Sequence, residues 1–211
     1  MTYINDIHAL PVTLCLKTTR NAAPKTATLL QRGFVLPVSG TISIAELLMG
    51  LSGFNEEYIR ERVQTIFVNG VAEDNTSRKL SAGDTLALSA AMPGLAGAIF
   101  RRGGQHASLR TRPVAVQSDI TDQSGYITLK FFNMIATETG PQLLQTGILI
   151  KGKTLARFLD RQGERILPVI ERAEVKRIPL EPGMLADAIT NQELVFLRIQ
   201  RKDAESAEGM S

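Results

Sequence analysis

Short apolar runs bounded by turn residues mark the first hundred positions of the chain. These runs predict strands at 12–16, 34–36, 65–68 and 85–88. Between the second and third runs, apolar residues recur at helical spacing over 44–51, which predicts a helix. The order strand, strand, helix, strand, strand predicts an α+β fold, with the helix packed on one face of a small mixed sheet.

Residues with specific backbone roles stand at the ends of these elements. Ser43 and Glu46 have the spacing of a capping box, which predicts that the helix begins just after Ser43. The pair Asn69-Gly70 closes the third strand and predicts a tight turn. Before the second strand, 28–33 predicts a helical turn that ends at Gly33.

Part of this first half resembles a known family. The residues are Ile66-Phe-Val-Asn-Gly70, Lys79-Leu80, Ala82-Gly-Asp-Thr-Leu-Ala-Leu88 and Met92-Pro-Gly94. In this order they are similar to the ubiquitin-like β-grasp sulfur carriers, which include the small subunit of molybdopterin synthase and the thiamin-thiazole sulfur carrier. The resemblance implies a β-grasp domain over 10–100.

The chain departs from that family at the functional end. In the sulfur carriers the last strand leads to a C-terminal Gly-Gly, whose carboxylate is adenylated and converted to a thiocarboxylate. Gly94 matches the first of these glycines, but Leu95 follows it and more than 100 further residues come after. The uncut chain therefore cannot present this terminal carboxylate.

The second half repeats a pattern of the first. A strand, the letters LLQ-x-Gly, three apolar residues, a Gly and an amphipathic helix occur in both 12–48 and 127–159. Each half also ends in a predicted strand, at 85–88 and 193–199. We interpret 124–202 as a second small α+β unit and a degenerate copy of the first. Chance similarity between two α+β units is the alternative, which a comparison of strand order tests.

A segment rich in Gly and basic residues, 101–123, joins the two predicted domains, and a polar tail, 203–211, is expected to fray. No acidic residue occurs from 85 to 118. Gly103 and Gly104 follow two arginines, as in the tail of ubiquitin, so cleavage after Gly104 would expose a diglycine. The cationic side chains predicted to bind a partner or an anion are those of Arg101, Arg102, His106, Arg110 and Arg112.

One stretch fits a phosphate-binding motif letter for letter. Residues 147–154 read G-x-x-x-x-G-K-T. A true phosphate loop follows a strand, whereas here the letters between Gly147 and Gly152 themselves form a predicted strand. We therefore interpret Gly152 as the bend between that strand and the next helix, and we expect no nucleotide binding there. Nucleotide binding that is lost in Lys153→Ala would contradict this interpretation.

Composition narrows the class of protein. The chain has 24 Lys and Arg against 21 Asp and Glu, a net charge of +3 that is too small to make the whole chain a nucleic-acid binder. One Cys and two His exclude a disulfide scaffold and a structural zinc site. No targeting segment is recognised, and the longest uncharged stretch, 85–100, is interpreted as a buried strand followed by a turn. We expect a cytoplasmic protein.

These observations favour a non-catalytic interaction module that has diverged from the sulfur carriers. No set of residues in the sequence has the pattern of an active site, so we expect no enzyme activity. We also expect no metal, no cofactor and no contact with membranes. The expected partner is a protein that binds the exposed sheet face and the basic segment. The alternatives are a sulfur-carrier precursor cut after Gly104, and an anion- or RNA-binding module that uses Arg101–Arg112. Nucleic acid is disfavoured because Phe100 is the one aromatic residue near that cluster.

Overall fold

The computed structural model describes residues 12–18, 23–110 and 124–201. Within these ranges it is an α+β protein with seven α-helices, ten strands of mixed sheet and a separate two-stranded ribbon. The chain divides into two units, each described here by itself. Of the described residues, the first unit holds 35–110 and 124–139, and the second holds 12–18, 23–34 and 140–201.

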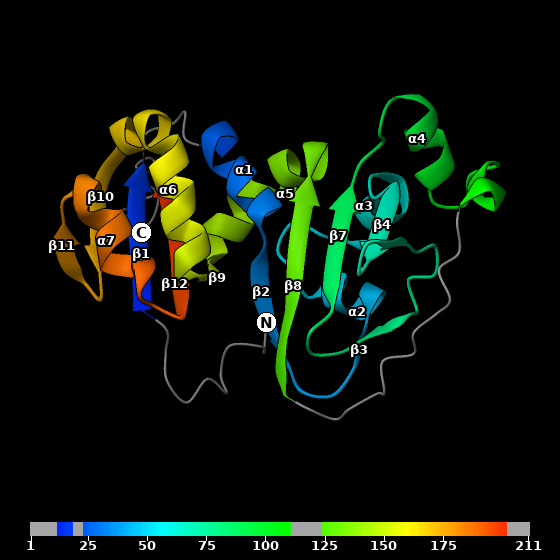
Figure 1. Cartoon of the computed structure of the whole chain (residues 1–211), viewed down its shortest axis with the longest axis horizontal. Helices are drawn as coiled ribbons and strands as arrows, with labels where there is room; N and C mark the ends of the chain where they lie inside the picture. Colours follow the sequence, from blue (N-terminus) through cyan, green and yellow to red (C-terminus); the bar gives the residue numbers. More distant parts are fainter. Residues whose placement is uncertain (1–11, 19–22, 111–123, 202–211) are drawn as a thin grey trace, which may run out of the picture. The chain divides into compact units, whose positions relative to one another are not determined.

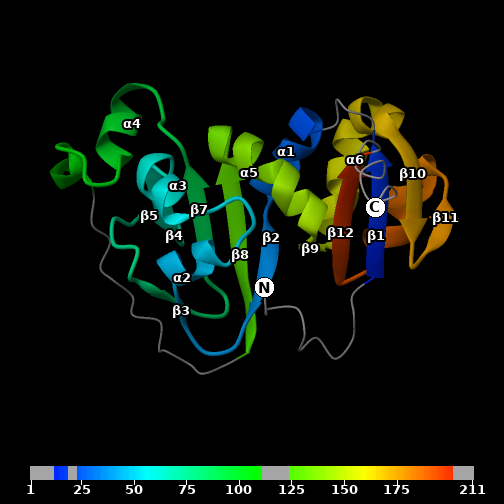
Figure 2. The same cartoon turned by 180° about the vertical axis from the view of Figure 1, so that it is seen from behind.

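In the first unit, five strands lie in the order β2-β8-β7-β4-β5. The central strands β7 and β8 are parallel, and β4 pairs antiparallel with both β7 and β5. The helices α2 and α3 lie on the face of this sheet that Figure 2 turns toward the viewer. The elements are β2 (Phe34–Val38), β3 (Ile42–Ser43), α2 (Ile44–Met49), α3 (Glu56–Glu61), β4 (Thr65–Val68), β5 (Val71–Ala72), β6 (Lys79–Leu80), β7 (Thr85–Ser89), α4 (Gly94–Phe100), the 3-10 helix η2 (Ala107–Leu109) and β8 (Gly125–Phe132).

The local signals of the first half are confirmed. The Ser43 hydroxyl accepts a hydrogen bond from the Glu46 N–H, and the Glu46 carboxylate accepts one from the Ser43 N–H, so the capping box is complete. Asn69 and Gly70 both have positive φ, of 52° and 81°, as a tight hairpin turn requires. The apolar side of α2 is buried, and the Phe54 and Phe131 rings meet at 5.4 Å, which packs the α2–α3 connection against β8.

In the second unit, five strands lie in the order β11-β10-β1-β12-β9. The central strands β1 and β12 are parallel, and the outer pairs are antiparallel. The helix α6 lies over one face of this sheet, with α7 against it (Figure 1). The elements are β1 (Val12–Thr18), α1 (Ala23–Arg32), β9 (Ile148–Lys151), α6 (Gly152–Ile166), η3 (Leu167–Val169), β10 (Ile170–Val175), β11 (Ile178–Leu180), η4 (Pro182–Met184), α7 (Leu185–Thr190) and β12 (Leu194–Arg201).

The repeated sequence pattern corresponds to repeated local structure. In both halves a strand, a helix, a glycine, a strand and a helix occur in this order, as β1-α1-β2-α2 and β8-α5-β9-α6, where α5 spans Asn133–Thr146. The first series differs in that the two-residue strand β3 precedes α2. The glycine that ends the first helix of each series has a similar conformation, with φ of 101° at Gly33 and 108° at Gly147. Glycine suits both positions because other residues rarely adopt such angles.

The first strand of each half pairs outside its own half. β8 begins the second half but lies beside β7, the last sheet strand of the first half. β1 begins the chain but lies beside β12, the last strand of the second half. We match the strands by their order within each half, so that β1, β2, β4, β5 and β7 correspond to β8, β9, β10, β11 and β12. The first sheet then reads β2-β8-β7-β4-β5 and the second reads β9-β12-β1-β10-β11. The two orders agree except that the central parallel strands are exchanged. The units therefore do not coincide with the predicted ranges 10–100 and 124–202.

The structure differs from the expectations for 85–100 and for the described part of the linker 101–123. The interpretation of 85–100 as a strand and a turn is wrong at its end, because Gly94–Phe100 forms the helix α4. Within the expected linker, 101–110 forms a turn and η2. Residues 111–123, including Arg112, and the expected frayed tail 203–211 lie outside the described residues. No helix in the described ranges is long and apolar enough to cross a membrane.

Candidate interaction site around α4

The helix α4 begins at Gly94, the position that the family resemblance aligns with the first glycine of the sulfur-carrier tail. Gly94 has a φ of 76° and follows Pro93, which occupies the N-cap position in extended conformation. The chain therefore turns back at this point instead of running on as a free extended tail. Phe100, at the end of α4, packs on Phe67 of β4 with ring centroids 5.3 Å apart.

Arg102 fixes the end of α4 to the body of the first unit. Its N–H donates to the Gln64 carbonyl at 2.7 Å, and its guanidinium Nη2 donates to the Ile59 carbonyl at 2.9 Å. Burial lowers the pKa of the Arg102 guanidinium, and the charge of Asp74 partly opposes this. Arg102 therefore acts as an internal anchor.

Arg110 fixes the other end of the same segment. Its guanidinium donates to the Ile99 carbonyl at 2.8 Å, to the Arg101 carbonyl at 2.6 Å and to Asp74 at 2.8 Å. Only 10% of this side chain is exposed. The donors that could bind an external anion are thus directed at the chain's own acceptors.

The remaining predicted residues have different surroundings. Arg101 and His106 are exposed, and Gly103 lies in an exposed turn that the Gly104 N–H closes on the Arg101 carbonyl at 3.0 Å. The structure therefore brings Arg101, Arg102 and Arg110 together but uses the last two internally.

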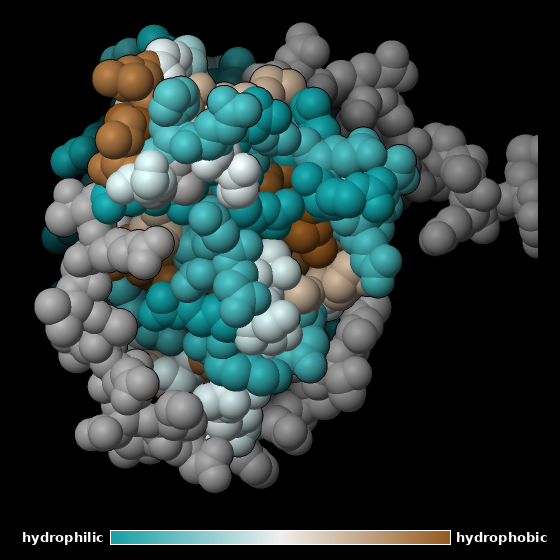
Figure 3. All heavy atoms as spheres, turned by 90° about the vertical axis from the view of Figure 1, so that its right-hand side faces the viewer, coloured by the Kyte–Doolittle hydropathy of each residue, from teal (hydrophilic) through white to brown (hydrophobic). Residues whose placement is uncertain are grey.

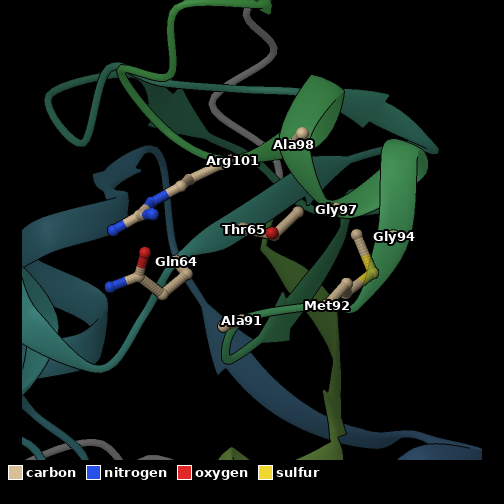
Figure 4. Close-up of a pocket in the computed structure, with 8 residues that line it drawn as sticks. All are labelled: Gln64, Thr65, Ala91, Met92, Gly94, Gly97, Ala98 and Arg101. Carbon is tan, nitrogen blue, oxygen red and sulfur yellow. The ribbon is translucent and has the colours of Figure 1, made fainter.

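A cavity of about 230 Å³, here called the α4 pocket, lies beneath this helix. Figure 4 shows Gln64 and Arg101 on one side, Met92 and Gly94 on the other, and Thr65 between them. The Thr65 hydroxyl is buried and has no hydrogen-bond partner among the described residues. No described residue bonds to the Arg101 guanidinium either. The lining residues are Gln64, Thr65, Ala91, Met92, Gly94, Gly97, Ala98 and Arg101.

Apolar side chains stand exposed on the elements around the pocket. Leu95 on α4 is 71% exposed, and Leu109 on η2, which packs with α4, is 64% exposed. Figure 3 looks onto the side of the first unit that carries α4 and shows a mostly hydrophilic surface interrupted by a few hydrophobic side chains. The sequence does not signal the pocket, because its lining joins β4 to a segment some thirty residues later, and Thr65 is an ordinary strand residue in the sequence.

A second polar cluster in the first unit is internally satisfied. The Tyr58 hydroxyl donates to Glu138 at 2.7 Å, and the Arg62 guanidinium donates to both oxygens of the same carboxylate. The hydrogen bond from Arg62 is the largest cause that lowers the pKa of the Glu138 carboxyl, and the bond from Tyr58 adds to it. Burial is the largest cause that raises the pKa of the Tyr58 hydroxyl. The cluster connects α3 with α5. Within the described ranges, no group of three or more His, Cys, Asp and Glu side chains could hold a metal ion.

Comparisons of the chain with protein-family models, with curated proteins and with solved structures found no match.

Proposed function

We propose that this chain is a non-catalytic protein-interaction module that binds a partner protein at the α4 pocket. One observation carries the proposal: Arg101 and Thr65 line the same cavity, and neither the Arg101 guanidinium nor the buried Thr65 hydroxyl has a partner in the described part of the chain. A buried polar group without a partner costs free energy, which a bound acceptor would recover. A carboxylate side chain of the partner would accept from both groups.

The size and rim of the α4 pocket fit this kind of ligand. Its volume of about 230 Å³ is below the roughly 300–1,000 Å³ of pockets that enclose drug-sized molecules. It therefore suits one inserted side chain. Leu95 and Leu109 supply apolar contact area beside it, as the desolvated centre of a protein interface requires.

The proposal includes a relationship to the β-grasp sulfur carriers. The first unit has a mixed sheet with helices on one face, which is the same broad α+β class as the fold that the resemblance implies. Its strand β8 comes from beyond the range 10–100, and β1 pairs with β12 in the second unit. In place of a free diglycine tail the chain has the anchored helix α4. We infer that the partner-binding surface was kept while the chemistry of the tail was lost.

The test is quantitative capture of partners from an extract of the cells that produce the protein. Full-length wild-type chain is compared with Arg101→Gln and Leu95→Ser, and captured proteins are measured by mass spectrometry. The matched controls are Arg60→Gln, whose side chain is 70% exposed, and Ile178→Ser, which is 68% exposed in the second unit. All variants must melt like the wild type.

The proposal expects one protein that the wild type and both controls capture and that both α4 variants lose. Capture that is unchanged in Arg101→Gln and Leu95→Ser would contradict it, as would the absence of any captured protein.

Cleavage after Gly104 remains the second candidate, because the turn at Gly103 is exposed and accessible to a protease. The intact mass of the protein from its native cells tests it: a fragment that ends at Gly104 supports a sulfur-carrier precursor, and a 23.0 kDa chain contradicts it. An anion- or RNA-binding surface over Arg101–Arg112 has less support, because Arg102 and Arg110 bond to the chain's own carbonyls.

A further inference from the structure

A second cavity, again of about 230 Å³, lies in the second unit between the end of α1 and one face of α6. Figures 1 and 2 show these two helices beside each other, and they are in contact. Three of its five lining residues are arginines. The residues are Arg32, Thr154, Arg157, Phe158 and Arg161, and we call this the arginine cavity.

The spacing of the α6 residues explains why they share one face. Thr154, Arg157, Phe158 and Arg161 stand at intervals of three, four and seven, which places them along one side of a helix. Phe158 is 4% exposed and closes the cavity toward the core, whereas Arg157 and Arg161 are exposed. Arg32 joins them from the last turn of α1.

None of the three guanidinium groups is held in an ion pair by the described residues. In the described ranges, no hydrogen bond or ion pair involves the side chain of Arg32, Arg157 or Arg161, in contrast to Arg102 and Arg110. Asp160 and Glu164 lie on the same helix but make no ion pair with these arginines. Like charges on neighbouring turns of a helix destabilise it.

A structural role accounts for only part of this arrangement. A cation in the last turn of a helix interacts favourably with the helix dipole, which explains Arg32. Arg157 and Arg161 lie in the middle of α6, where this interaction is absent. A bound anion would offset the repulsion among all three.

We propose that the arginine cavity binds the phosphate groups of a small molecule, with inorganic diphosphate as the simplest ligand. The planar guanidinium donates two parallel hydrogen bonds to phosphate oxygens, and the half-buried Thr154 hydroxyl adds a further donor. The volume accommodates a diphosphate but not an enclosed nucleotide. Any larger ligand would place only its phosphorylated end inside.

This site differs from the phosphate loop that the letters of 147–154 suggest. A Cβ at Gly152 would lie 2.3 Å from the carbonyl oxygens of both Ile189 and Gln192, so the backbone there is packed against α7 and its C-terminal end. Lys153 is exposed and does not line the arginine cavity. The two sites therefore predict different effects of substitution at position 153.

The test is calorimetric titration of the full-length chain with inorganic diphosphate, at low and at moderate salt. Arg157→Gln and Arg161→Gln remove one guanidinium each. Lys153→Gln and Arg165→Gln are matched controls, since both remove an exposed cation of α6 that does not line the cavity. Because a hydrogen bond to a charged group contributes about 1.5–3 kcal/mol, each cavity variant is expected to bind about tenfold more weakly or worse.

Each outcome decides the proposal. Saturable binding that both cavity variants lose and both controls keep supports it. Adenosine diphosphate as a second probe identifies the source of the phosphate: equal affinity indicates free diphosphate, and higher affinity indicates a larger phosphorylated molecule. No binding at low salt overturns the proposal. Diphosphate binding that is lost in Lys153→Gln alone would also overturn the proposal, because it would indicate a phosphate loop. Diphosphate binding that is weakened equally in all four variants would overturn it as well. Tighter binding of a single-stranded RNA oligonucleotide that all four variants weaken equally would also overturn it.

Discussion

The carbonyl oxygen of Met92 packs so closely on Gly97 that a Cβ built at position 97 would lie 1.8 Å from it. The Gly97 residue is buried in α4, and this contact holds the helix against the loop that follows β7. No side chain fits between the two backbones. The close approach forms the base of α4 and shapes one wall of the α4 pocket.

Gly97→Ala is therefore expected to displace α4. Overpacking of this kind typically costs about 1–3 kcal/mol of unfolding free energy, to be measured by chemical denaturation. Gly183→Ala is the control, since a Cβ there would meet nothing within 4 Å. An unfolding midpoint for Gly97→Ala equal to that of the wild type would show that α4 does not depend on the contact.

Arg110→Gln is expected to loosen the segment that follows α4. The substitution removes the bonds of the guanidinium to two carbonyls and to Asp74. Local opening should increase about tenfold or more, because bonds to a charged group contribute about 1.5–3 kcal/mol each. The measurement is the rate of tryptic cleavage after Arg101 and Arg102, with fragments assigned by mass spectrometry. Arg60→Gln, which loses only a surface ion pair with Glu61, should be cleaved there as slowly as the wild type.

Local structure was predictable where one short signal decides the backbone. The capping pair Ser43 and Glu46 starts α2, and Asn69-Gly70 forms its turn. The two LLQ-x-Gly stretches end in Gly33 and Gly147 with nearly the same φ. In each case the residues that determine the geometry are adjacent in sequence, so no knowledge of tertiary contacts is needed.

Strand pairing was not predictable in the same way. β1 and β8 both carry a buried side chain at alternate positions, as Leu14 and Leu129 illustrate, and either pattern suits either sheet. Nothing local specifies that β8 pairs with the last strand of the first half and β1 with that of the second. Helix α4 was missed because Pro93, Gly94 and Gly97 resemble turn signals. In the structure Gly97 instead permits close packing.

The candidate site was predictable only as a region. Charge alone singled out 101–112, but it could not distinguish Arg101, which is exposed, from Arg102 and Arg110, which bond inward. That distinction depends on carbonyl groups of other elements. The arginine cavity was missed for a related reason, since Arg32 lies far in sequence from Arg157 and Arg161.

Thr65→Val is expected to have opposite effects on stability and on binding. Because the buried Thr65 hydroxyl has no partner among the described residues, an apolar side chain of the same shape should raise the unfolding free energy by about 1 kcal/mol. The same change should weaken capture of the partner at the α4 pocket. The control is Thr139→Val, whose buried hydroxyl donates to the Ile135 carbonyl at 2.8 Å, and which should lose about 0.5–1.5 kcal/mol. A destabilised Thr65→Val would mean that its hydroxyl is already satisfied in the free protein.

Because of Glu46, the unfolding free energy of the first unit should vary with pH in the acidic range. Its carboxylate accepts hydrogen bonds from the Ser43 hydroxyl and N–H and pairs with Lys79, which lowers its pKa from the ordinary 4.5 to about 2. The charged form is thus favoured by folding. Its contribution is fully present above about pH 4.5 and disappears as the pH falls toward 2.

Denaturant unfolding from pH 6 down to pH 3 tests this expectation. The stability difference between wild type and Glu46→Gln should be largest at pH 6 and should shrink steadily below pH 4.5. Ser43→Ala removes the largest cause of the lowered pKa, so its Glu46 carboxylate, followed by NMR, should titrate at higher pH than in the wild type. A wild-type Glu46 that titrates near 4.5 would show that the capping box does not hold its charged form in solution.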